Sequence, residues 1–332
     1  MSEGDFEQRM YLQWSKDIWL AIWAKGILSN GCICSRAKIY RWRYERSEFF
    51  IGDELTMNIA VLSGKGGTGK TTVSTNLSLA LKSNYIDCDV EEPNGFLFLN
   101  PKIHNEEKVM VEYPIIDKDK CTNCGKCVEV CQFNALAKSN NKILLFDKLC
   151  HGCGACQISC KFDAISYGKR EIGKIEIGSI NDLNCIRGVL NVGEPMAVPV
   201  IKTLLKNLPQ GNNLIDCPPG TSCNVVNALN YADVAILVTE PSQFGLHDLK
   251  MAVELVKLYK IPFCIVINKE DDENNIIKEY CIDEKITLLG SIPYDKEAAR
   301  IYSKGEMLYS DPNYKRIFDK LSNRLKEVLP WN

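Results

Sequence analysis

At 332 residues, the chain is long enough for one large domain or two modest ones. Its 45% hydrophobic and 25% charged residues give the balance of a soluble globular protein. A formal net charge of −2 supplies no overall basic field, so we expect no nucleic-acid partner.

The sequence also gives little reason to expect membrane insertion or export. A transmembrane helix requires about 20 consecutive apolar residues, and the longest candidate, Ile18–Ala24, has seven. The first residues are acidic, unlike those of a secretory signal. We therefore expect a cytoplasmic protein with no membrane anchor, in which the cysteines stay reduced.

Residues 1–56 differ from the rest of the chain, because they contain four of the five tryptophans and a basic run from Arg36 to Arg46. A helix over about 11–28 would be apolar on all sides, without a clean amphipathic stripe. One interpretation is a membrane-surface or partner-binding helix. The favoured one is an extension outside the fold, such as an upstream start codon would add, since Met57 directly precedes a strong strand.

From Met57 onward, buried strands alternate with helices. Continuous apolar strands between helices predict an α/β fold whose parallel sheet is covered by helices on both faces. A cysteine-rich segment interrupts this alternation and is therefore interpreted as an insertion. The expected domains are an α/β domain formed by 57–114 and 168–332, with the insertion at 115–167. The expected strands are 58–63, 85–89, 214–217, 234–239, 263–268 and 288–292, and the expected helices are 72–82 and 247–259.

The first strand leads into a glycine-rich turn with the spacing of a phosphate-binding P-loop. Glycines let backbone N–H groups surround phosphate oxygens, and the following helix directs its positive end to the same place. Lys70 is expected to contact the β- and γ-phosphates, and Thr71 to offer its hydroxyl to Mg²⁺. The expected nucleotide-binding residues of the loop are Gly64, Lys65, Gly66, Gly67, Thr68, Gly69, Lys70, Thr71 and Thr72.

Eight of the sixteen cysteines form two runs with identical Cys-x2-Cys-x2-Cys-x3-Cys spacing. This spacing is typical of ferredoxins that hold two 4Fe–4S clusters, in which the fourth ligand of each cluster comes from the other run. Zinc sites use pairs of Cys-x2-Cys with longer gaps, so zinc is the weaker alternative. The expected ligand sets are Cys121, Cys124, Cys127 and Cys160 for one cluster, and Cys131, Cys150, Cys153 and Cys156 for the other.

The segment Lys65-Gly-Gly-Thr-Gly-Lys-Thr-Thr72 resembles the deviant Walker A motif of the MinD, ParA and nitrogenase iron protein group. With the cysteine runs, the chain from Met57 to about Leu308 resembles MinD-superfamily P-loop ATPases that carry an inserted ferredoxin domain. The resemblance implies that Lys65 reaches the nucleotide of a partner subunit in an ATP-dependent homodimer.

The same resemblance assigns roles to the polar residues that follow three strands. Asp216 would hold Mg²⁺ through its water shell, and the N–H of Gly220 would sense the γ-phosphate. Asp89 would position the hydrolytic water, while Asp87 would support the magnesium site. Asn268 would bond the adenine ring; the resemblance implies ATP, although the residues alone leave GTP open.

Lys65, Lys70, Asp89 and Asp216 are therefore the expected catalytic residues, with ATP, Mg²⁺ and two 4Fe–4S clusters as cofactors. The first functional hypothesis is an ATPase that couples nucleotide state to electron transfer toward a redox partner. The second is an iron–sulfur cluster carrier that delivers clusters to an apo-acceptor protein, for which Cys217 or Cys223 would bridge a dimer. A positioning role on a membrane is more remote.

Overall fold

The structure is a computed structural model that describes residues 57–271 and 275–328. The expectations for residues 1–56 lie outside this range. A nine-stranded sheet forms its centre, with the order β11-β10-β9-β1-β8-β2-β7-β6-β3. In that order the strands are β11 (Leu288–Pro293), β10 (Phe263–Glu270), β9 (Val234–Thr239), β1 (Asn58–Leu62), β8 (Asn213–Asp216), β2 (Asn84–Asp87), β7 (Leu183–Leu190), β6 (Ile165–Ile180) and β3 (Lys102–Ile116).

The strands from β11 to β7 pair in parallel, as the apolar runs predict for all of them except β7, which was not among the expected strands. Successive side chains of a strand point to opposite faces, and β1 shows this directly. Ile59 and Val61 belong to one buried cluster, whereas Ala60 and Leu62 belong to the other. The sheet is therefore buried on both faces, and the expected α/β architecture is confirmed.

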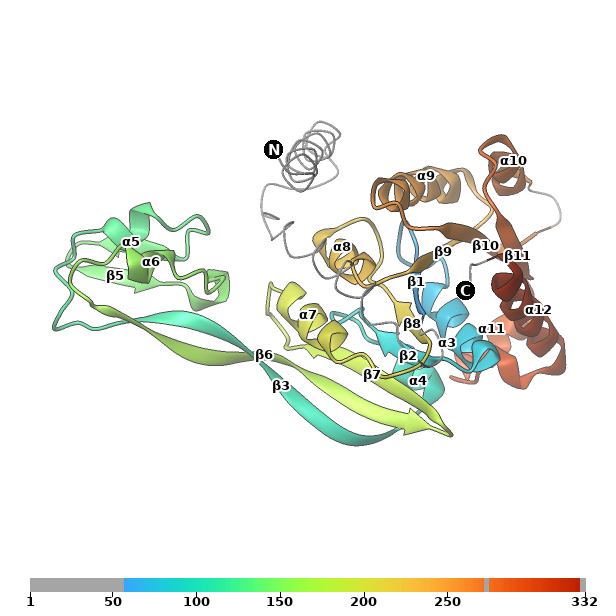
Figure 1. Cartoon of the computed structure of the whole chain (residues 1–332), viewed down its shortest axis with the longest axis horizontal. Coiled ribbons are helices and arrows are strands. Elements are labelled where there is room, and N and C mark those ends of the chain that lie inside the picture. Colours follow the sequence, from blue (N-terminus) through green and yellow to red (C-terminus); the bar gives the residue numbers. More distant parts are fainter. Residues whose placement is uncertain (1–56, 272–274, 329–332) are drawn as a thin grey trace, which may run out of the picture.

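Helices cover both faces (Figure 1). The cluster with Ala60 and Leu62 receives α7 (Val198–Lys206), α8 (Cys223–Leu229), α9 (Gln243–Leu258) and α10 (Ile276–Asp283). The opposite cluster receives α3 (Lys70–Leu81), α4 (Gly95–Leu99), α11 (Lys296–Ser303), η2 (Leu308–Ser310) and α12 (Pro312–Val328). Within the described ranges, no helix has the length and apolarity needed to cross a membrane.

Strands β3 and β6 form a long antiparallel ribbon that extends away from the sheet (Figure 1). We call this ribbon the arm. The cysteine-rich segment lies at its end, between Ile116 and Ile165, and has its own small core around Cys127, Leu136, Cys156 and Ile165. Its elements are α5 (Lys126–Glu129), β4 (Leu136–Ser139), β5 (Lys142–Leu145), η1 (Asp147–Leu149) and α6 (Ala155–Ile158).

Candidate functional site: a phosphate-binding loop and two cysteine cavities

The P-loop connects the end of β1 to the start of α3, at the carboxyl edge of the parallel strands. Two of its glycines are required by geometry. Gly69 precedes the helix with a φ of 87°, a left-handed conformation that side chains disfavour. At Gly64, an added Cβ would lie 2.2 Å from the carbonyl oxygen of Asp248 on α9. The loop therefore packs directly on α9 while its backbone turns toward the cleft.

A cleft opens beside the P-loop and is lined from several elements. Tyr294, Asp295 and Tyr302 come from the β11–α11 region, and the sequence interpretation gave them no role in the site. Their position after the last parallel strand was the available signal, because ligands bind at carboxyl ends of such strands. The expected site residues that line the cleft are Gly66, Gly67, Thr68, Gly69, Lys70, Thr71, Thr72, Asp89 and Asn268.

A buried polar cluster lies behind the cleft. The Lys70 Nζ lies 2.5 Å from Oδ1 of Asp216, and both side chains are almost fully buried. The hydroxyl of Tyr85 donates to Oδ2 of Asp216 at 2.9 Å. It also lies 3.4 Å from Oδ2 of Asp87, which accepts from the N–H of Gly95 at 3.1 Å. Asp87 and Asp216 therefore share one buried site, and Tyr85, to which the sequence interpretation assigned no role, joins them.

Burial and mutual repulsion alter the protonation of these groups. Desolvation, reinforced by the charge of Asp216, raises the pKa of Asp87 to about 8. Desolvation also raises the pKa of Asp89 to about 6, although Lys70 opposes the shift. Burial alone would lower the pKa of Lys70, but its attraction to Asp216 outweighs that effect and raises it. The shift therefore favours the protonated form of Asp87 more strongly than that of Asp89.

Gly220 and Asn268 contact the P-loop region through specific hydrogen bonds. The N–H of Gly220 donates to the carbonyl of Ser63 at 2.9 Å. The side-chain amide of Asn268 donates to the carbonyl of Thr68 at 2.7 Å, from the same cleft in which a base would lie. Both residues therefore bond the backbone of the P-loop region, and only Asn268 lines the cleft.

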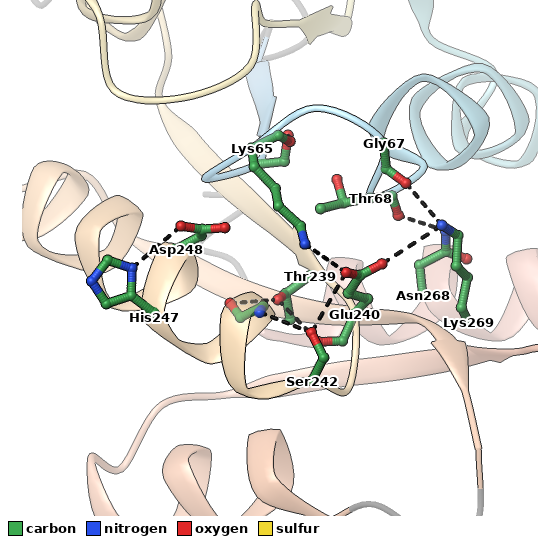
Figure 2. A network of polar contacts seen from close by, with 12 residues as sticks. Lys65, Gly67, Thr68, Thr239, Glu240, Ser242, His247, Asp248, Asn268 and Lys269 are labelled. Carbon is green, nitrogen blue, oxygen red and sulfur yellow. Dashed lines mark hydrogen bonds and ion pairs between the residues drawn. The ribbon is translucent and has the colours of Figure 1, made fainter.

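Lys65 is not among the residues that line the cleft, and its side chain points toward Glu240, directly after β9 (Figure 2). Its Nζ lies 2.7 Å from Oε1 of Glu240, and the attraction to Lys65 lowers the pKa of that carboxyl. Lys269 lies 3.6 Å from the other oxygen of Glu240 and donates to the carbonyl of Gly67 at 2.8 Å. Glu240 therefore pairs with Lys65 of the same chain. No sequence motif had indicated this role for Glu240.

The two cysteine runs surround two separate cavities at the end of the arm. The first cavity is lined by Cys121, Cys124, Cys127 and Cys160, and we call it the distal cavity. The second cavity is lined by Cys131, Cys150, Cys153 and Cys156, and we call it the proximal cavity. Each cavity thus takes three cysteines from one run and the last cysteine from the other.

The names follow the position of each cavity along the arm. Ile116 and Ile165, the pair at the tip of the arm, line the distal cavity. Pro114 and Tyr167, which lie opposite each other two residues closer to the sheet, line the proximal cavity. In addition, Lys148 beside the proximal set donates to the carbonyl of Gly193 in the β7–α7 loop at 3.2 Å.

The cavities suit a group with several metal atoms. Three cysteines, Cys127, Cys150 and Cys156, are buried, and two, Cys124 and Cys153, are exposed. Gly125 and Gly154 have φ values of 86° and 81°, a left-handed conformation that lets the cysteine-bearing loops turn tightly. Among the described residues, no three His, Cys, Asp or Glu side chains converge closely enough to hold a single metal ion. The four cysteines of each set instead line a common cavity.

The scattered cysteines behave differently. Cys217, which the carrier hypothesis would use to bridge a dimer, is fully buried beneath the P-loop sheet. Burial raises the pKa of its thiol, with Asp216 adding to the shift. This chain conformation therefore keeps Cys217 away from any partner surface, which contradicts that part of the carrier hypothesis.

Comparisons with known proteins place this site in context. The CobQ/CobB/MinD/ParA nucleotide binding domain matches residues 59–308. The uncharacterized protein MJ0579 of Methanocaldococcus jannaschii is 36% identical over 284 residues, which cover 83% of this chain and 97% of that protein. An iron-sulfur cluster carrier protein of Pyrococcus horikoshii is 26% identical over 302 residues, 81% of this chain and 87% of the carrier.

Among solved structures, the septum site-determining protein MinD of Pyrococcus horikoshii, complexed with Mg-ADP, has a similar fold. Its TM-score is 0.52 at 21% identity, and the match covers 82% of this chain and 97% of that one. The shared fold agrees with the parallel sheet described above.

Proposed function

The chain belongs to the CobQ/CobB/MinD/ParA nucleotide-binding family, and we propose that this ATPase couples its nucleotide state to electron transfer through two 4Fe–4S clusters. The observation that carries the proposal is the pair of cavities, each lined by four cysteines from both runs. They lie at the end of the arm formed by β3 and β6 (Figure 1). The expected working compartment is the reducing cytoplasm.

In the nucleotide site, the P-loop amides and Lys70 would bind the phosphates of ATP. Bound Mg²⁺ would supply charge neutralisation between the β- and γ-phosphates. Thr71 and Asp216 are the residues that would hold it, and Lys70 must exchange its contact with Asp216 for one with phosphate. Asp89 lines the cleft and is partly ionised near its pKa of about 6, which suits a residue that orients a water molecule.

For the cysteine cavities, the fit rests on donor chemistry and shape. Cysteine thiolates are the ligands of 4Fe–4S clusters, which supply one-electron chemistry when bound. Four sulfurs around a common cavity are the required number for one cubane. Burial of Cys127, Cys150 and Cys156 would protect clusters that stay bound through many turnovers.

The first structural connection between the two sites is the chain itself. Asp89 follows β2, and only the segment with α4 separates it from β3 of the arm. On the return strand, Glu176 of β6 accepts from Nε of Arg187 at 2.6 Å. Arg187 lies opposite Asp87 in the β2–β7 pair. Strand β6 of the arm is thus linked, through Arg187 of β7, to the strand that carries Asp87.

A second connection runs through the β7–α7 loop. The carbonyl of Val90, next to Asp89, accepts from the N–H of Leu190 at 2.8 Å. Four residues later, Glu194 pairs with Arg170 of the arm at 2.7 Å, and both side chains are largely buried. A movement of the Asp89 segment on ATP binding would therefore be transmitted to the base of the cluster-bearing module.

The test is anaerobic oxidation of the reduced protein by an external acceptor, followed through visible absorbance with and without MgATP. Electron transfer predicts about eight irons per chain and a faster oxidation with ATP. The Lys70→Ala variant, which should lose phosphate binding, should keep its iron but lose the ATP effect. Iron of four or fewer per chain would contradict the two-cluster assignment, and an ATP-independent rate would contradict the coupling.

The second candidate, a cluster carrier, is favoured by the relatives that bear that name. It predicts that iron and sulfide move from the protein to an apo-ferredoxin. The same anaerobic sample mixed with apo-ferredoxin and then separated by ion exchange distinguishes the two. Clusters retained by this chain support electron transfer, and clusters recovered on the acceptor support a carrier.

A further inference from the structure

The two cysteine runs repeat with a separation of 29 positions, Cys121 matching Cys150, but the polar groups around the two cavities do not repeat. Asn123 of the first run corresponds to Gly152 of the second. Lys138 corresponds in the same way to Tyr167. These differences decide which kind of polar group faces each set of sulfur atoms.

In the proximal cavity, hydrogen-bond donors face two ligand sulfurs. The Tyr167 hydroxyl lies 3.2 Å from Sγ of Cys156, and with a cluster-bound thiolate it can only donate. The N–H of Gly152 donates to Sγ of Cys150 at 3.4 Å. Tyr167 reaches this place because it lies opposite Pro114 on the arm, where both residues line the cavity.

In the distal cavity, an acceptor faces a ligand sulfur instead. The Oδ1 of Asn123 lies 3.8 Å from Sγ of Cys121. The amide cannot simply turn its nitrogen to the sulfur, because Nδ2 donates to the carbonyl of Asn141 at 2.8 Å. A carbonyl oxygen beside a thiolate opposes additional negative charge on the cluster.

Two cations near the distal cavity have only a weak effect on the charge of a cluster bound there. Lys126 lines the cavity, but its ammonium pairs with Glu129 at 2.6 Å. Lys138, the counterpart of Tyr167, is exposed and places its chain beside Gly125. Water and salt screen such an exposed charge, whereas the contacts to Cys121 and Cys156 are direct.

We propose that Tyr167 and Asn123 give the two clusters unequal reduction potentials, with the proximal cluster higher than the distal one. This inference rests on the proposed function. Donors to ligand sulfurs stabilise the extra negative charge of a reduced cluster and raise its potential. A single electron held by the module therefore resides at the proximal site, next to the Lys148–Gly193 contact and the ATPase body.

The experiment is an anaerobic potentiometric titration of the full holoprotein, with each reduced cluster followed by electron paramagnetic resonance. Wild-type protein should show two separate midpoints. In Tyr167→Phe, the higher midpoint should fall by a roughly tenfold change in the equilibrium constant for reduction, about 59 mV for one electron. The lower midpoint should stay in place.

Two further variants keep the inference testable if Tyr167→Phe fails to retain clusters. Asn123→Gly removes the amide oxygen, and glycine accepts the φ of 57° at this position, so the lower midpoint should rise. Tyr113→Phe removes a hydroxyl from the same arm without touching a cavity, and both midpoints should remain unchanged.

A single common midpoint in wild type, or midpoints that ignore both Tyr167 and Asn123, would overturn the inference. These outcomes differ from a failure of the proposed function. Anaerobic protein without iron and sulfide would contradict the clusters themselves, whereas protein with the full iron content and equal midpoints contradicts only the unequal potentials.

Discussion

At the scale of single residues, the burial of Asp87 beside Asp216 should make the free energy of unfolding depend on pH. The folded chain keeps a proton on Asp87 up to a pKa of about 8, and on Asp89 up to about 6. The unfolded chain releases both near pH 4. Since the folded state binds more protons across this window, the free energy of unfolding should fall as pH rises from about 4 to about 8.

Asp87→Asn should remove the upper part of this slope, between about pH 6 and 8. The amide oxygen can still accept from Gly95, so the local hydrogen bond is retained. Urea unfolding of the nucleotide-free protein across this pH range measures the effect. Asp182→Asn, an exposed change, is the control. Equal slopes for wild type and Asp87→Asn would show that Asp87 is not the protonated group.

A second residue-scale prediction concerns Glu240, which pairs with Lys65 at 2.7 Å (Figure 2). If Lys65 serves a partner subunit, Glu240 competes for it within the monomer. Glu240→Gln should therefore weaken that competition and lower the ATP concentration needed for dimerisation several-fold, a gain of about 1 kcal/mol. Light scattering during gel filtration measures the dimer.

Two further variants serve as controls for this prediction. Glu284→Gln removes an exposed partner of Lys257 at 3.0 Å and should leave dimerisation unchanged. Lys65→Ala should abolish the ATP-dependent dimer. A dimer that forms normally with Lys65→Ala would show that this lysine acts only within its own subunit.

At the scale of elements, the arm was the part that the sequence interpretation described least well. The sequence interpretation expected the insertion to span residues 115–167. It therefore assigned no secondary structure to residues 102–114 and 168–180. These residues form the long β3–β6 ribbon, whose strands pair across a large sequence separation. Much of β3 is exposed on both faces, so it lacks the clean alternation that identifies a half-buried strand.

The buried strands were predictable for the opposite reason. The segments 234–239 and 263–268 are continuous apolar runs, and both lie in the parallel sheet as β9 and most of β10. The P-loop was equally clear, because its glycine spacing follows directly from phosphate geometry. Contacts between distant side chains, such as Glu240 with Lys65 and Tyr85 with Asp216, leave no periodic signal and required the structure.

The attachment of the arm gives an element-scale prediction. Glu194 pairs with Arg170 at 2.7 Å, and their side chains are 8% and 12% exposed. Glu194→Ala would leave a largely buried guanidinium without this carboxylate, at a cost of about 3 kcal/mol. It should also reduce the ATP effect on oxidation of the clusters, because the β7–α7 loop would lose its hold on the arm.

Glu171→Ala is the matched control for this change. Glu171 neighbours Arg170 in the chain, but its partner Lys108 is 75% exposed, so the loss should stay within about 1 kcal/mol. Urea unfolding and anaerobic oxidation, measured on both variants, separate the effects. A Glu194→Ala protein with full ATP response would exclude the β7–α7 loop as the connection.

At the scale of the whole molecule, the cysteine module and the sheet that carries the nucleotide site have separate hydrophobic cores. The cysteine module packs around Cys127, Leu136, Cys156 and Ile165, whereas the sheet has its own clusters on each face. Ile116 and Ile165 are opposite each other at the end of the antiparallel arm. The module can therefore be removed where the strands are already adjacent, and an Asn-Gly turn suits a two-residue hairpin connection.

Replacing residues 117–164 by Asn-Gly should give a folded protein that binds and hydrolyses ATP but contains no iron. The sheet, the P-loop and the Lys70–Asp216 pair all lie outside the deleted segment. Calorimetry with ATP and iron analysis of the purified protein measure the two properties. Because Lys148 would be lost with its bond to Gly193, the β7–α7 loop should loosen, and its amide exchange should accelerate. If the shortened chain fails to bind ATP, the module is required to shape the nucleotide site. The module and the nucleotide site would then depend on each other for folding, and not only through the nucleotide state.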